Sequence, residues 1–187
     1  HPQNCQAQDG IRDHLLGLVG SEMCIRDSPS IHEVRKEVLW GNLMGGGAGV
    51  EYYFGYQLPQ NDLGAQDWRS RQATWNYSRI ALEFFQDQAI PFWEMSNHDE
   101  LVGNPEHDNS MYCFAKAGEV YLVFRPGPGP VNLDLTGDSG DYAVKWFNPR
   151  TGGELVEGSV QGVKGGAKIN LGNPPSDEEQ DWLIVVR

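Results

Sequence analysis

The sequence has few basic residues and no long apolar run. It contains 14 Lys and Arg against 26 Asp and Glu, so its formal net charge is −12. A chain this acidic has little electrostatic attraction to nucleic acid or to an anionic membrane surface. No stretch approaches the roughly 18 apolar residues that a membrane-spanning helix needs. We therefore expect a soluble, globular protein that binds neither nucleic acid nor a membrane.

Cysteine is also scarce, and this argues against a disulfide framework or a cysteine-based metal site. The three cysteines, Cys5, Cys24 and Cys113, lie far apart and form no CxxC pair. Histidines and carboxylates gather between His98 and Asp108, and such groups are ordinary zinc ligands. Their spacing matches no helix-based or strand-based ligand motif, so a solvated linker is the interpretation we favour. We predict no metal and no cofactor.

The start of the chain has the features of a fragment. It begins with His1, and no charged segment followed by an apolar segment marks an export signal. Residues 18–28, LVGSEMCIRDS, resemble the translation of a transposon end used in sequencing libraries. The alternative for residues 18–28 is an ordinary loop or short helix. We expect residues 1–17 and 29–187 to be two pieces of one gene with the intervening stretch missing.

The first half of the remaining chain reads as alternating helices and a strand. Ser30 and Glu33 form a capping-box pattern, and apolar residues then recur at helical spacing, which predicts a helix over residues 31–44. The aromatic segment 49–56, between glycines, predicts a buried strand. A second helix is expected over residues 71–88, with Trp75, Ile80, Ala81, Phe84 and Phe85 on its apolar face.

The second half has the pattern of an antiparallel β-sandwich. Residues 96–109 are polar and rich in turn formers, which indicates a linker. Beyond it, short apolar segments alternate with Gly, Pro, Asp and Asn, as in a sandwich of about seven strands. Trp146 and Trp182 are expected to anchor its core. The predicted strands are residues 111–115, 119–125, 131–135, 142–147, 154–160, 167–171 and 182–187.

Five segments carry a resemblance to a family of bacterial glycoside hydrolases. They are IHEVRKEVLWGNLMGGGAGVEYYFGY (31–56), DWRSRQATWNYSRIALEFF (67–85), YCFAKAGEVYLVF (112–124), VKWFNPRTGGEL (144–155) and DWLIVVR (181–187). Members of this family join a TIM barrel, often named apiosidase-like, to a C-terminal collagen-binding domain. The resemblance implies α/β plus all-β architecture: an incomplete (β/α)8-barrel remnant followed by the sandwich. The implied parts are residues 1–17, an earlier barrel segment; 29–100, the last barrel units; and 108–187, the collagen-binding domain.

The resemblance also implies hydrolysis of glycosidic bonds by two carboxylates, which usually lie near the fourth and seventh barrel strands. Both positions fall in sequence that this chain lacks, so we assign no catalytic residue. A closed barrel needs about 200–250 residues, and far fewer precede the sandwich here. We therefore expect the C-terminal fragment of a secreted, extracellular or periplasmic glycosidase, inactive alone. The alternative is a non-catalytic module that binds matrix protein or glycan.

Four residues are candidates for contact with a polysaccharide or oligosaccharide. Glu51 lies in an apolar segment, where a charge is costly unless it is paired. It could hold a sugar hydroxyl, and the competing interpretation is a structural ion pair with a cation such as Arg35. Tyr53, Tyr56 and Trp68 could stack against sugar rings, and filling the core explains each of them equally well.

Overall fold

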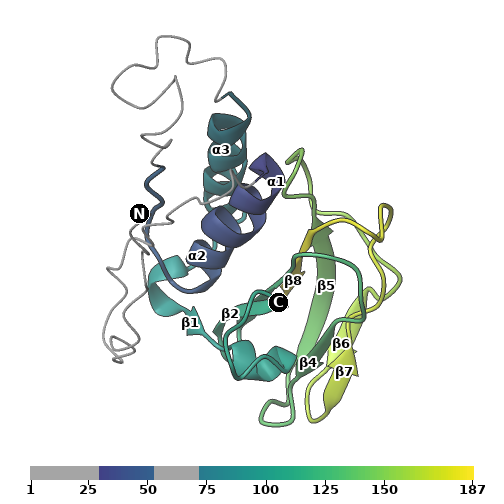
Figure 1. Ribbon diagram of the computed structural model, residues 1–187. Coiled ribbons are helices and arrows are strands. Elements are labelled where there is room, and N and C mark those ends of the chain that lie inside the picture. The colour runs from purple at the N-terminus through teal and green to yellow at the C-terminus, as the bar shows by residue number, and fades with distance from the viewer. Residues whose placement is uncertain (1–29, 53–71) are drawn as a thin grey trace, which may run out of the picture.

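The computed structural model describes residues 30–52 and 72–187, in which a helical layer packs on a twisted antiparallel sheet (Figure 1). The helices are α1 (Ile31–Glu33), η1 (Val34–Trp40), α2 (Gly41–Met44), α3 (Gln72–Asp87), η3 (Phe92–Glu94) and η4 (Asp99–Val102). The strands are β1 (Ser96–Asn97), β2 (Tyr112–Lys116), β3 (Val120–Arg125), β4 (Asn132–Asp134), β5 (Asp141–Phe147), β6 (Gly162–Lys164), β7 (Lys168–Asn170) and β8 (Trp182–Val186).

The predicted helix over residues 31–44 is confirmed, with one local difference. Ser30 accepts a hydrogen bond from the Glu33 backbone, and the Glu33 carboxylate accepts one from the Ser30 backbone, so the capping box is formed. The middle segment, η1, is a π-helix rather than an α-helix. In a π-helix each backbone carbonyl oxygen accepts from the N–H group five residues later, so Arg35 and Trp40 lie on the same side of η1. Both side chains are buried.

The second predicted helix is also confirmed, as α3. Ile80, Ala81 and Phe84 are buried, as expected. Trp75 is 46% exposed, so its placement on the buried face was wrong. Helix α3 lies beside η1, where Trp40 contacts the rings of Phe84 and Phe85 with centroid separations of 5.9 and 6.3 Å.

The strands form two sheets, and this two-layered arrangement agrees with the predicted β-sandwich. The larger sheet has the order β1-β2-β3-β8-β5-β6, and the smaller one pairs β4 with β7. All the strand pairs are antiparallel. Strand β8, the last in sequence, lies in the centre between β3 and β5, so the sheet is completed only when the C-terminus is in place.

The central strands are buried on both faces, because helices cover one face and the small sheet covers the other. On β3, Leu122 and Phe124 pack with Trp40 and Phe84 of the helices. The sheet residues that alternate with these point to the opposite face and pack with Leu133 of β4 in a second apolar cluster. Every residue of β3 and β8 is buried, so these strands read as continuous apolar runs. The helices and the sandwich therefore share one sheet.

Two predicted strands need correction. Residues 154–160 do not form a strand: Val156 makes an isolated bridge to Trp146, and the strand on the side of β5 away from β8 is β6, further along the chain. The chain crosses so close to the Trp146 indole at Gly158 that only glycine fits there. Residues 49–52 adopt no strand, and residues 53–56 lie outside the described part.

The segment 96–109 is folded rather than a solvated linker. Strand β1 pairs with β2, and the side chains of Asp99 and Asn104 are buried. Asp99 accepts a hydrogen bond from the Cys113 backbone at 2.7 Å, and Asn104 donates to the carbonyl oxygen of Met111 at 2.7 Å. These buried polar bonds attach the segment to the start of β2.

Candidate functional site

Of the predicted sugar-contacting residues, only Glu51 lies in the described part of the chain. Its side chain is exposed. Arg35, one of the cations considered as a partner for Glu51, binds the carboxylate of Asp181 instead. Tyr53, Tyr56 and Trp68 lie outside the described residues, as do residues 1–28. The sugar-binding assignment of these four residues stays a prediction.

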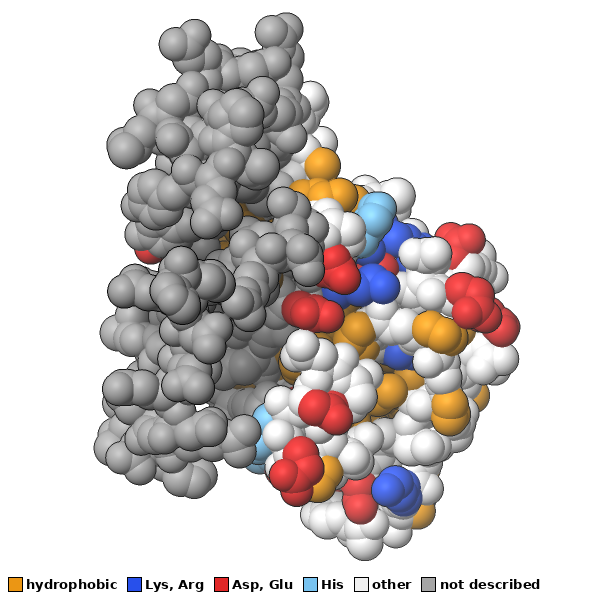
Figure 2. Space-filling model, in the orientation of Figure 1, with side chains coloured by type: hydrophobic (Ala, Val, Ile, Leu, Met, Phe, Trp, Pro, Cys, Tyr) orange, Lys and Arg blue, Asp and Glu red, His pale blue; other side chains and the backbone are white. Residues whose placement is uncertain are grey.

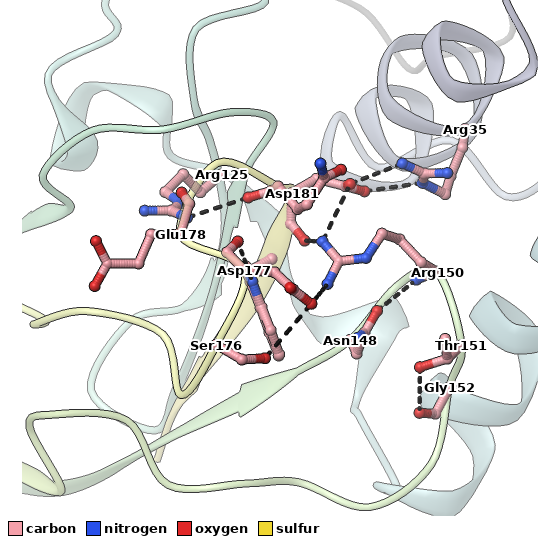
Figure 3. A network of polar contacts seen from close by, with 12 residues as sticks. Arg35, Arg125, Asn148, Arg150, Thr151, Gly152, Ser176, Asp177, Glu178 and Asp181 are labelled. Atoms are coloured by element: carbon pink, nitrogen blue, oxygen red, sulfur yellow. Dashed lines mark hydrogen bonds and ion pairs between the residues drawn. The ribbon is translucent and has the colours of Figure 1, made fainter.

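The strongest polar contact joins the helical layer to the sandwich (Figure 3). Arg35 of η1 donates from Nε and from a terminal nitrogen to the two carboxylate oxygens of Asp181, at 2.9 and 2.7 Å. Asp181 directly precedes β8, and 146 positions separate it from Arg35. Both side chains are almost fully buried, at 1% and 0% exposed. The Arg35 guanidinium also lies 4.7 Å from the centre of the Tyr77 ring on α3.

Arg150 extends this contact to the turn after β5. It donates to the Asp181 carbonyl oxygen at 3.0 Å and to the Asp177 carboxylate at 3.1 Å, and it lies over the Trp182 ring. Figure 3 shows Asp181 between the two guanidinium groups of Arg35 and Arg150. Trp182 donates its indole N–H to the Asp177 carbonyl oxygen, as expected of a buried tryptophan. This network fixes the start of β8 to η1 and to the turn after β5, so its role is structural.

A second polar cluster surrounds Asp138 in the connection between β4 and β5. Its carboxylate accepts hydrogen bonds from the hydroxyls of Tyr121 and Tyr142 and from the Gly140 backbone. These bonds to the charged form lower the pKa of Asp138 to about 2. Burial is the largest cause that raises the pKa of Tyr142, and the hydrogen bond to Asp138 raises it further. The cluster stabilises the loop, and none of its residues lines either of the two hollows described below.

The buried carboxylates of the described residues have structural partners. Asp181 and Asp99 are buried and engaged in the contacts given above. One hollow, near the C-terminus, has a volume of about 230 Å³ and a single carboxylate, Glu154, in its lining. A second hollow has none among its described lining residues. Retaining and inverting glycosidases both need two carboxyl groups flanking the bond that breaks, and neither of these two hollows has two in its described lining.

The second hollow is an apolar groove between the helices. It has a volume of about 320 Å³ and lies between η1–α2 and α3, with Leu43, Val50, Leu82 and Phe85 in its lining. Leu82 is 58% exposed, which is unusual for a large apolar side chain next to other apolar groups.

Many acidic side chains lie on the face of the molecule in Figure 2. On the face in Figure 2, acidic side chains are spread widely, and the basic ones among them form no extended patch. Among the residues that the structure describes, no group of three or more His, Cys, Asp or Glu could hold a metal ion. Within the same residues, no helix is long and apolar enough to cross a membrane.

Comparisons with known proteins confirm the expected likeness of the C-terminal region. A family described as "Putative collagen-binding domain of a collagenase" matches residues 98–187. This match starts ten residues before the predicted boundary at 108 and includes Asp99 and Asn104. No curated protein matches the chain.

Two solved structures show the same fold over a larger part of the chain. One, described as "Glycoside hydrolase", is 15% identical with a TM-score of 0.60, and the match covers 83% of this chain and 36% of that chain. A glycoside hydrolase family 5 protein from Bacteroides vulgatus ATCC 8482 is 16% identical, with the same TM-score and coverage. This chain therefore spans about a third of the length of these proteins.

Proposed function

We propose that this chain is the C-terminal, non-catalytic part of a glycoside hydrolase that acts on polysaccharide outside the cytoplasm. In this proposal the helices η1 and α3 are the last helices of a TIM barrel, and the sandwich is an accessory domain against them. The carrying observation is the likeness of fold to glycoside hydrolases over 83% of this chain and only 36% of theirs. Catalytic carboxylates of the parent protein would then lie in sequence outside this chain.

Two structural features support this proposal. The buried Arg35–Asp181 pair makes the helices and the sandwich parts of one folded unit, as an accessory domain fixed to a barrel requires. The apolar groove beside Leu82 is the face that barrel strands would cover, because barrel helices pack their apolar side on the sheet they surround. We also propose that residues 18–28 mark an artificial join, which one long sequencing read across it would test.

The test is to express the protein encoded by the uninterrupted gene and to assay it on plant and algal polysaccharides. Release of reducing ends is expected, and it should disappear when either barrel carboxylate is replaced by its amide. A full-length protein that cleaves none of these substrates would contradict the proposal. Secretion of the full-length protein, with removal of an N-terminal signal, would test the proposed extracellular or periplasmic location.

A second candidate is a binding module for matrix protein or glycan. The observation that favours it is the match of residues 98–187 to a family described as collagen-binding. Surface plasmon resonance with the whole chain on immobilised collagen tests this alternative. Saturable binding would favour it, whereas an accessory domain fixed to a barrel should show none.

A further inference from the structure

Trp93 is the most exposed large hydrophobic side chain among the described residues. It is 82% exposed, against 46% for Trp75 and 58% for Leu82. An indole usually buries much of its large apolar surface, so one held in solvent by a turn whose neighbouring side chains pack into the core is a candidate contact surface. Trp93 is separate from the groove, which has Phe92 but not Trp93 in its lining.

The turn that carries Trp93 is fixed by its neighbours. On one side of it, Phe92 packs against the rings of Phe85 and Phe114, with centroid separations of 5.4 and 4.9 Å. On the other side, Met95 packs against the same apolar core. Backbone bonds from Glu94 to Pro91 and from Met95 to Phe92 close the short helix η3. Because both flanking side chains point inward, the turn holds Trp93 outward.

Hydrogen-bonding groups lie next to the exposed indole. Glu94 follows Trp93 in the chain, and its carboxylate accepts from Lys116 at 2.8 Å. Lys116 also binds Glu119 at 2.6 Å, which forms a row of one ammonium and two carboxylates beside the turn. All three remain partly solvent-exposed, at 29–60%. A flat apolar ring beside fixed donors and acceptors matches a sugar, whose ring has an apolar C–H face and a rim of hydroxyls.

We propose that Trp93 and the adjacent Glu94–Lys116–Glu119 row form a surface site for a pyranose ring of a neutral glycan. The inference rests on the proposed function, since it places the glycan on the accessory part of a polysaccharide-degrading protein. A proline-rich collagen strand fits less well, because polyproline-type ligands dock in grooves lined by several aromatic rings, and here a single indole is exposed. The net charge of −12 disfavours uronic-acid polymers.

The experiment is a titration of the ¹⁵N-labelled full chain with neutral oligosaccharides, read from its indole N–H resonances and, in the Trp93 variants, from the backbone amides of the same turn. Cellohexaose, xylohexaose, mannohexaose and laminarihexaose are the probes, and oligogalacturonate and a collagen-like peptide are comparisons. Trp93→Phe identifies the Trp93 signal among the six tryptophans. At least one neutral probe should shift this signal, with a dissociation constant on the order of 1 mM, because one ring and solvent-exposed hydrogen bonds give weak binding.

Substitutions separate the site from other surface effects. Trp93→Ala should weaken binding at least about 10-fold, and Trp93→Tyr should retain part of it because a ring remains. Trp75→Ala is the matched control, an exposed tryptophan on α3 without the charged row, and should bind as the wild type does. If Trp93→Ala fails to fold, the titrations of the wild type and of Trp93→Tyr decide whether the glycan binds at Trp93.

The inference is overturned if no neutral probe shifts the Trp93 signal, if Trp93→Ala binds as tightly as the wild type, or if only the collagen-like peptide binds. Its failure is distinct from that of the proposed function. Hydrolysis by the full-length protein without binding at Trp93 would remove the surface site alone. Binding at Trp93 without hydrolysis by the full-length protein would remove the enzymatic proposal alone.

Discussion

Breaking the Arg35–Asp181 pair should destabilise the whole fold. Asp181→Ala leaves the Arg35 guanidinium 1% exposed with no carboxylate to balance its charge. Removing one partner of a buried ion pair costs about 3–5 kcal/mol. This is a large part of the roughly 5–15 kcal/mol that holds a typical protein folded. For a chain of this size the loss corresponds to a fall in melting temperature of about 6–20 °C.

The surroundings predict that the two single substitutions differ. In Arg35→Met, Asp181 keeps a second cation nearby, because a terminal nitrogen of Arg150 lies 3.8 Å from its carboxylate. In Asp181→Ala, Arg35 keeps only the His32 ring nitrogen at 3.0 Å and the face of Tyr77. Arg35→Met should therefore cost less than Asp181→Ala. The double variant Arg35→Met/Asp181→Leu should recover most of the loss, since apolar replacements leave no buried charge.

The assay is urea unfolding followed by tryptophan fluorescence and circular dichroism, with a double-mutant cycle for the pair. Urea is uncharged and does not screen the ion pair. Glu83→Ala is the control: it breaks the exposed Arg79–Glu83 pair, whose side chains are 56% and 49% exposed. Exposed helical pairs of this kind contribute about 0.3–0.5 kcal/mol. An Asp181→Ala loss no larger than that of Glu83→Ala would refute the reasoning.

Three further predictions concern single residues. The pKa of Asp138 is lowered to about 2 in the folded chain, so its stabilising contribution is present above about pH 4 and is lost as the pH falls through 2. Asp138→Asn should remove this contribution to the acid dependence of the melting temperature. An unchanged dependence would contradict the prediction. Burial raises the pKa of the Cys113 thiol, so iodoacetamide should label it only in urea, as peptide mapping would show; labelling in the folded chain contradicts this. Gly158→Ala places a methyl group in steric conflict with the Trp146 indole nitrogen and should cost about 1–3 kcal/mol. Gly137→Ala meets no atom within 4 Å and should be tolerated, so equal melting temperatures for the two variants would refute the argument.

Local sequence signals predicted the helices and most strands correctly. The capping box at Ser30 and Glu33 is a contact between residues three apart, and its pattern is visible in the sequence. The turn after β5 is closed by a similarly local contact, in which the Gly152 backbone donates to the Asn148 carbonyl oxygen. Apolar runs at β3 and β8 predicted strands. These features depend on neighbouring residues alone.

Features that depend on distant partners were missed. The pairing of β1 with β2 and of β5 with β6 follows from the assembled sheet, and no local pattern distinguishes residues 162–164 from the wrongly predicted strand 154–160. Asp181 carried a usable signal, because it is a charge directly before the apolar run of β8 and is costly there without a partner. The same argument was applied to Glu51, which the structure places in solvent.

The candidate site was the least predictable part. Whether an aromatic side chain fills the core or faces solvent depends on what packs against its turn. Trp146 and Trp182 are buried at 0% and 2%, as expected, whereas Trp93 is exposed because Phe92 and Met95 occupy the core on either side of it. The sequence around Trp93 is uniformly apolar apart from Glu94, so its orientation required the structure.

The most direct test of the account is a reducing-end assay on the purified 187-residue chain alone, with the polysaccharides used for the full-length protein. The account predicts no release above the uncatalysed background, because the proposed function places the two catalytic carboxylates in sequence outside this chain. Sustained release of sugar at an enzyme-like rate of about 1 s⁻¹ or more by this chain would contradict it.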